Sequence, residues 1–190
     1  MRFKAPPHHH MLRQQDKERR VERFIRQHLN AAPVPDAAAL LVVARCCGSP
    51  VARALLAAAE AQRLPQVSVR IVLASDDCGL EAWLDGAHGV GMRIDEVRIA
   101  RNPHLHDAHE QLVLGSSAVW FGDCLRRDPA KRDAFEAYCP HDAAGALRAR
   151  ATFERLWLTT EPFCQPPSAP MALAAAGDAA PRPPRSTARA

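Results

Sequence analysis

Short continuous apolar runs recur along this chain, and the segments between them place apolar residues with a helical period. Residues 38–44 are all apolar and residues 67–74 nearly all apolar, a pattern typical of strands buried on both faces of a parallel sheet. Between them, Ser49 and Pro50 offer a helix cap followed by proline at the first helical position, and the predicted helix extends to about Arg63. This order predicts a βαβ unit with parallel strands and a right-handed crossover.

The same patterning continues further along the chain. It predicts a short helix over residues 79–88, a third strand over 93–100, a hairpin with strands at 110–114 and 117–121, a helix from Asp128-Pro129 to about Cys139, and a last helix over 143–159. Alternating strands and helices followed by adjacent strands are typical of the α/β class. We therefore expect one α/β domain over residues 37–164.

The two ends of the chain differ from this domain in composition. Residues 12–29 predict a helix in which Val21, Phe24 and Ile25 share one face while arginines crowd the rest. A basic helix can bind nucleic acid or a membrane surface, or it can be simply solvated. We assign residues 1–36 to this basic helix and a linker, and residues 165–190, which are rich in proline and alanine, to a disordered tail.

Overall composition narrows the class of protein. A length of 190 residues fits one domain, and a net charge of +4 permits an anionic partner without requiring one. No apolar run approaches the roughly 20 residues of a membrane span and no secretory signal is visible, so we expect a cytoplasmic protein without a membrane span. The six cysteines form no CxxC pair and are predicted to be reduced, buried thiols.

The side chains best suited to catalysis or ligand binding gather between positions 102 and 123. His104, His106 and His109 precede the first hairpin strand, and Gly122-Asp123 follows the second. Because a hairpin brings those two ends together, we expect any active site there.

The spacing of the three histidines resembles the HxHxDH signature of metallo-β-lactamase-like hydrolases. That signature has an aspartate directly before its last histidine, whereas Ala108 stands there in this chain. Imidazoles suit zinc, so a metal-dependent hydrolase that uses His104, His106 and His109 is one hypothesis. Another is that these histidines are ordinary loop residues and that a backbone carbonyl satisfies His109.

The hairpin is also similar to the motif of the phospholipase D superfamily, HxKxxxxD followed after a short gap by Gly-Ser. His109 and Gly122 match this motif. Gln111 stands in place of its lysine, Ser116 in place of its aspartate and Asp123 in place of its serine. The resemblance covers about residues 38–160 and implies the family's βαβαβββα sandwich, with no metal ion and no cofactor.

In that family the motif histidine attacks phosphorus, and a second histidine from a second motif protonates the leaving group. The resemblance therefore implies a metal-independent phosphodiesterase with His109 as nucleophile and with Glu110 and Gln111 in reduced supporting roles. Because this chain holds one motif, the resemblance also implies a homodimer in which two His109 side chains face each other. The missing lysine removes a transition-state contact that typically contributes about 3–4 kcal/mol.

A basic cluster follows the motif at the start of the next predicted helix. Cations beside a helix N-terminus favour a phosphate, although a solvated turn is the alternative. The predicted ligand-binding residues are Ser116, Gly122, Asp123, Arg126, Arg127 and Lys131. The leading hypothesis is a degenerate phospholipase D-like domain that binds a phosphate-containing ligand or nucleic acid with weak or no catalysis. The active phosphodiesterase and the metal-dependent hydrolase are its alternatives.

Overall fold

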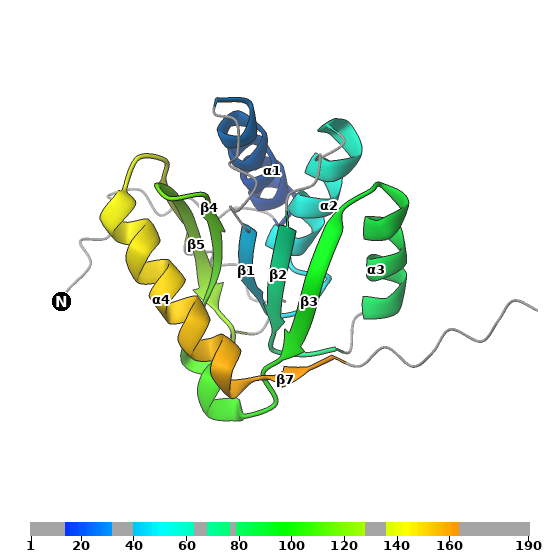
Figure 1. Cartoon of the computed structure of the whole chain (residues 1–190), viewed down its shortest axis with the longest axis vertical. Helices are drawn as coiled ribbons and strands as arrows, with labels where there is room; N and C mark the ends of the chain where they lie inside the picture. Colours follow the sequence, from blue (N-terminus) through cyan, green and yellow to red (C-terminus); the bar gives the residue numbers. More distant parts are fainter. Residues whose placement is uncertain (1–13, 32–39, 63–67, 77–78, 128–135, 164–190) are drawn as a thin grey trace, which may run out of the picture.

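A mixed β-sheet forms the centre of the molecule (Figure 1). The structure, a computed structural model, describes residues 14–31, 40–62, 68–76, 79–127 and 136–163. Within these residues the sheet has seven strands in the order β6-β5-β4-β1-β2-β3-β7. The strands are β1 (Leu40–Ala44), β2 (Ser68–Leu73), β3 (Arg93–Ile99), β4 (His109–Leu114), β5 (Ala118–Cys124), β6 (Ala137–Cys139) and β7 (Glu161–Pro162). Strands β1, β2 and β3 are parallel, and the remaining pairings are antiparallel.

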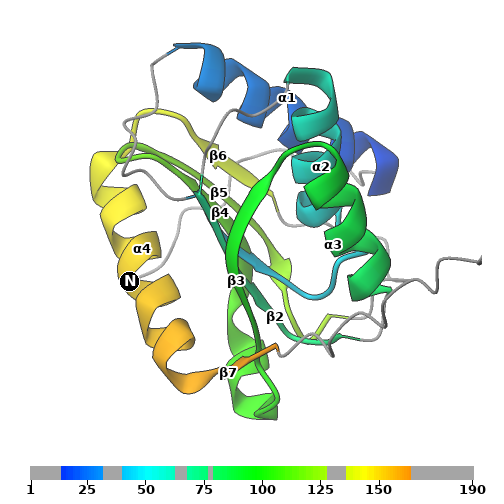
Figure 2. The same cartoon turned by 45° about the vertical axis from the view of Figure 1, so that its right-hand side comes forward.

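Helices cover both faces of the sheet (Figures 1 and 2). One face carries α1 (Gln14–Ala31), α2 (Pro50–Gln62) and α3 (Leu80–Gly89), and the other carries α4 (Ala143–Thr159). A short 3₁₀ helix, η1 (Pro103–Asp107), connects β3 to β4. The predicted α/β class and its single domain are confirmed, and so is the parallel pairing of the first two strands.

Alternation along the central strands builds a separate core on each side of the sheet. In β1, Leu40 and Val42 pack with α1, α2 and α3, whereas Leu41 and Val43 pack with α4. Successive strand residues point to opposite faces, so a strand covered on both sides needs apolar residues at every position. The same alternation in β4 fixes which side of the sheet each motif residue faces.

The predicted helix ending at Cys139 is wrong at that end. Ala137–Cys139 is the edge strand β6, which pairs with β5. There Tyr138 lies opposite Trp120, and its ring meets that of Phe24 edge-on at a centroid distance of 5.3 Å. The spacing of apolar residues reports a local period and cannot reveal that β5 offers a free edge with an aromatic partner. The predicted helix start at Asp128-Pro129 lies outside the described residues.

Helix α1 lies where the basic helix was expected and ends two residues later, at Ala31, whereas the expected start at residue 12 lies outside the described residues. Lys17, which reads as part of a solvated face, is instead 3% exposed. Among the helices of the described ranges, none combines the length and apolar character needed to cross a bilayer. The expected tail over 165–190 and most of the linker lie outside those ranges.

Candidate functional site

His109, Gly122 and Asp123 of the motif meet where the parallel strands reach their carboxyl ends, which we call the carboxyl edge of the sheet. Strand β4 runs antiparallel to β1, so His109 at its start lies beside the carboxyl end of β1. Strand β5 runs antiparallel to β4, which brings Cys124 opposite His109. The two ends of the predicted hairpin are therefore together, as expected. Ligands of open α/β sheets bind at this carboxyl edge.

His109 is exposed at this edge and is held by the backbone of the neighbouring strand. Its Nδ1 lies 2.9 Å from the carbonyl oxygen of Gly122. A carbonyl oxygen only accepts, so Nδ1 donates, and the neutral ring carries its lone pair on Nε2. This bond fits the hypothesis that a backbone carbonyl satisfies His109. It also fixes the tautomer that a nucleophilic histidine requires.

Gln111, in the place of the motif lysine, points away from the edge into the core. It is 3% exposed, and its Nε2 donates to the carbonyl oxygen of Ala149 in α4 at 3.1 Å. The neighbouring β4 residue Val113 packs on the same side of the sheet, against α4. The structure therefore gives Gln111 a bond that ties α4 to the sheet.

Glu110 faces the opposite side of the sheet and is also buried. Its Oε1 accepts a hydrogen bond from the backbone N–H of Arg45 at 3.3 Å. The carboxylate therefore fixes the turn that follows β1, and it keeps this turn beside the candidate site.

A β-bulge places Asp123 on the α1 side. His109 pairs with Cys124 and Gln111 with Phe121, so Gly122 and Asp123 together lie opposite the single residue Glu110. An extra residue of this kind re-aims the side chains that follow it. In a regular strand Asp123 would follow Phe121 to the α4 face.

Asp123 is held in an ion-pair network across the edge. Its Oδ2 accepts from Lys17 Nζ of α1 at 2.8 Å, and its Oδ1 accepts from Arg127 at 3.3 Å. The Lys17 ammonium also lies 5.5 Å from the centroid of the Trp120 ring. Asp123 thus anchors α1 to the end of the hairpin, a contact that the sequence did not predict.

Gly122 has a packing reason for being glycine. A Cβ atom built there would lie 2.9 Å from Cζ2 of Trp120 and 3.2 Å from the Cβ of Glu110. Either distance is too close for an ordinary contact, so a side chain would displace the indole ring. The match of Gly122 to the family motif is therefore explained without a ligand.

Arg45 is a site residue that the sequence reasoning missed. Its Nε donates to the carbonyl oxygen of Leu125 at 2.9 Å, and Nη2 donates to that of Cys124 at 3.1 Å. No carboxylate within the described ranges forms an ion pair with this guanidinium. The available signal was its position directly after the buried run of β1, at the carboxyl edge of a parallel strand.

The remaining predicted ligand-binding residues are not all part of this edge. Ser116 lies in the hairpin turn at the other end of β4, about 20 Å away for a six-residue strand. Arg126 is exposed, forms an ion pair with Asp107 at 3.0 Å and donates to the carbonyl oxygen of Pro103. Lys131 lies outside the described residues. The edge thus collects His109, Gly122, Asp123 and Arg127 but separates them from Ser116.

The three histidines have different partners. His106 Nε2 lies 2.9 Å from the carbonyl oxygen of Ala100, whereas His109 binds that of Gly122. His104 is exposed in η1. In the described part of the chain no three histidine, cysteine or acidic side chains are grouped so as to hold a metal ion.

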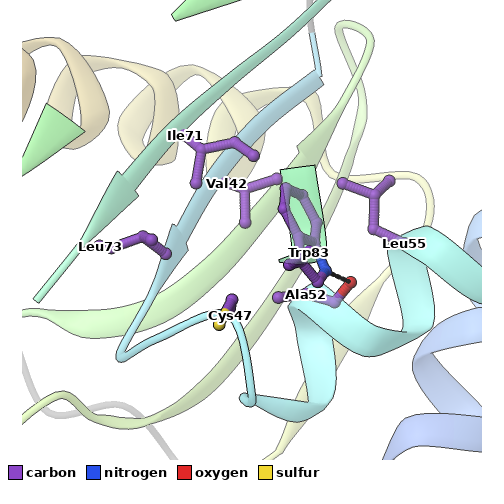
Figure 3. Close-up of a pocket in the computed structure, with 7 residues that line it drawn as sticks. All are labelled: Val42, Cys47, Ala52, Leu55, Ile71, Leu73 and Trp83. Atoms are coloured by element: carbon purple, nitrogen blue, oxygen red, sulfur yellow. Dashed lines mark hydrogen bonds between the residues drawn. The ribbon is translucent and has the colours of Figure 1, made fainter. Parts of the chain in front are cut away.

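A small apolar pocket lies under α2, within the core on the α1, α2 and α3 side of the sheet (Figure 3). Val42, Leu55 and Ile71 are among its lining residues, Trp83 closes it by donating to the Ala52 carbonyl oxygen, and it has no room for a water molecule. Burial raises the pKa of the Cys47 thiol on its wall, which favours the unreactive protonated form. The pocket is core packing rather than a ligand site.

Comparison with known proteins gives little further guidance. No family model matches the chain, and no curated protein matches it. Among solved structures it is similar to TrmBL2, an archaeal chromatin protein described as showing a novel mode of DNA binding. The TM-score is 0.43 and the identity 14%, over 76% of this chain and 51% of the other. The chain thus spans about half of that protein, and a likeness this low carries no functional argument.

Proposed function

We propose that this chain is a phospholipase D-like half-domain with a degenerate motif, which binds a phosphate-containing ligand or nucleic acid without efficient catalysis. The observation that carries the proposal is Arg45, whose guanidinium is held by two backbone carbonyls beside the His109 end of β4. A guanidinium presents a rigid fork of donors that matches the oxygens of a phosphate. Arg45 supplies a fixed cation where the motif lysine is missing.

Weak catalysis follows from the position of Gln111. The family's lysine stabilises charge on the phosphoryl group, and here that position holds a neutral amide bonded to α4. Removing one such contact typically costs about 3–4 kcal/mol of transition-state stabilisation. Binding survives this loss more readily than turnover, because binding does not depend on charge that develops only in the transition state.

A homodimer is part of the proposal. One chain supplies one His109, and the family's chemistry needs a second histidine to protonate the leaving oxygen. His109 is exposed at the sheet edge, so it is accessible to a second copy of the chain. Two copies that meet at this edge would also bring two Arg45 guanidinium groups to the same ligand.

An active phosphodiesterase is the second candidate, and the Nδ1–Gly122 bond favours it. In this reaction Nε2 of His109 attacks phosphorus, an N–P bond forms and the bond to the leaving oxygen breaks. His109 of the second copy of the chain donates a proton to that oxygen, and water then hydrolyses the phosphohistidine. No metal ion takes part in these steps.

The test combines binding and turnover on the full-length chain. Calorimetric titration with a dinucleotide should show a Kd that rises about 10-fold or more in Arg45→Gln, since a hydrogen bond to a charged group contributes about 1.5–3 kcal/mol. Arg155→Gln, an equal charge change on exposed α4, is the control and should leave the Kd unchanged. An equal weakening in both variants, or none in Arg45→Gln, would refute the site.

Hydrolysis of a chromogenic phosphodiester, with and without EDTA, separates the two candidates. EDTA-resistant turnover that His109→Ala abolishes would establish the phosphodiesterase. Dinucleotide binding without such turnover would establish the binding domain. Turnover that EDTA removes would contradict both.

A further inference from the structure

Helix α1 carries a stripe of arginines on the side that faces away from the sheet. Arg19, Arg23 and Arg26 are all exposed and are spaced at i, i+4 and i+7, which places them on one helical face. The buried residues Val21 and Ile25 lie on the opposite face. We call Arg19, Arg23 and Arg26 the arginine stripe.

Most of the positive charge of the arginine stripe is available to a partner. Arg19 and Arg23 form no ion pair with any residue that the structure describes. Arg26 pairs with Glu22 at 3.3 Å, but both side chains are exposed enough for such a pair to be weak. Glu18 is directed toward Arg53 of α2, at 3.9 Å. Asp16 is the remaining carboxylate, at the N-terminal end of the helix.

The arginine stripe runs from the candidate site toward the other end of strands β4 and β5, where their hairpin turn lies. At one end of α1, Lys17 binds Asp123 beside the site. Near the other end, His28 Nε2 lies 3.5 Å from the point where a Cβ on Gly115, in the hairpin turn, would lie. Figure 2 shows α1 lying over this part of the sheet beside α2. A ligand that binds at the site and extends along α1 would meet each arginine in turn.

We infer that the phosphate-containing ligand is double-stranded nucleic acid, whose backbone contacts the arginine stripe. This inference rests on the proposed function and names its ligand class. At 1.5 Å per residue the stripe spans about 10 Å, and duplex DNA presents one negative charge per roughly 1.7 Å of its axis. A small phosphate ester would leave this repeated charge unused.

One feature favours a duplex over a single strand, and another favours α1 over the neighbouring helix α3. Single strands are held largely by stacking on exposed aromatic rings, whereas the large apolar side chains most exposed in the described residues are Leu147 and Leu158 of α4. Helix α3, on the same side of the sheet as α1, exposes Glu81 and Asp85, which repel phosphates. On this side of the sheet, phosphates are therefore attracted to α1 rather than to α3.

The test measures binding of a fluorescein-labelled 20-base-pair duplex of mixed sequence by anisotropy between 50 and 200 mM KCl. The stripe variant is Arg19→Gln/Arg23→Gln. The control is Arg148→Gln/Arg155→Gln, which removes the same charge from exposed positions of α4 on the other side of the sheet. Loss of two phosphate contacts lowers the slope of log K against log salt by about 2 and weakens binding on the order of 100-fold at 50 mM salt. The control variant should retain the wild-type slope.

The outcomes separate this inference from the proposed function. Equal losses in the two variants would mean non-specific attraction by net charge and would overturn the stripe. Wild-type affinity in the stripe variant would also overturn it, and dinucleotide binding that still depends on Arg45 would leave the proposed function standing. Stripe-dependent binding to vesicles containing phosphatidylserine, with no binding to the duplex, would identify a membrane surface instead and overturn the inference.

Discussion

Replacing Gln111 by lysine would supply one residue of the phospholipase D motif, and we predict that it destabilises the protein without creating activity. Gln111 is 3% exposed, and its amide donates to the Ala149 carbonyl oxygen of α4. A lysine at this position would place its ammonium between the sheet and α4 rather than at the carboxyl edge. On folding, the charged ammonium would lose its contacts with water and enter an apolar core that offers it one carbonyl acceptor.

The cost can be worked from the burial. Full burial lowers the pKa of a lysine from about 10.4 by up to 3–5 units, and each unit corresponds to about 1.36 kcal/mol. At pH 7 the penalty is therefore about 3–5 kcal/mol, a large part of the roughly 5–15 kcal/mol that stabilises a typical domain. Because the folded-state pKa is lowered, the penalty decreases as pH rises and disappears above the unfolded value of about 10.4.

Urea denaturation of Gln111→Lys and of wild type at pH 7 and pH 10 measures this cost. The control Gln111→Met has a similar size and no charge, and it should lose only the bond to Ala149, about 0.5–1.5 kcal/mol. A Gln111→Lys protein with wild-type stability at pH 7 and new EDTA-resistant phosphodiesterase turnover would refute the reasoning. It would mean that the side chain at this position reaches the site.

Three further perturbations test the surroundings of the site. Lys17→Met should cost about 1.5–3 kcal/mol in urea denaturation, because it removes a buried charged bond to Asp123, and a change within 0.5 kcal/mol would contradict that role. Burial lowers the pKa of His28 from its usual value of about 6.5, so stability should fall as pH drops from 7 toward 5. In thermal melts His28→Gln should flatten that decline, and an unchanged profile would exclude His28 as its cause. Gly122→Ala should cost roughly 1–3 kcal/mol by displacing the indole ring beside it, whereas Gly89→Ala, with open space around its Cβ, should not be destabilising.

The order of elements could be predicted from the sequence because strands buried on both faces appear in it as runs of apolar residues. All five residues of β1 are apolar and buried, β2 is largely apolar, and the cap-and-proline pair at Ser49-Pro50 begins α2 where expected. The hairpin was also predictable, since Gly115 supplies the positive φ of its turn. These signals are local, and each belongs to one element.

The contacts that define the candidate site depend on several elements and left no local mark. The burial of Lys17 depends on Asp123, which faces α1 only because of the bulge in β5. Likewise, the buried position of Gln111 depends on α4, and no spacing within the motif reports it. Arg45 follows a recognisable strand end, but its value as a fixed cation depends on the carbonyls of residues 124 and 125.

The bond between Lys17 and Asp123 also has a consequence for biosynthesis. The two residues are separated by 106 positions. At roughly 5–20 residues per second, a ribosome needs about 5–20 s to add that length of chain. Helix α2 emerges much earlier, and α1 packs against it, so the α1–α2 pair can form long before the bond to Asp123. The part of α1 that meets Trp120 and Tyr138 must stay uncovered until β5 and β6 have been made. Helix α1, which is translated before the other described helices, is therefore among the last of them to be fully docked.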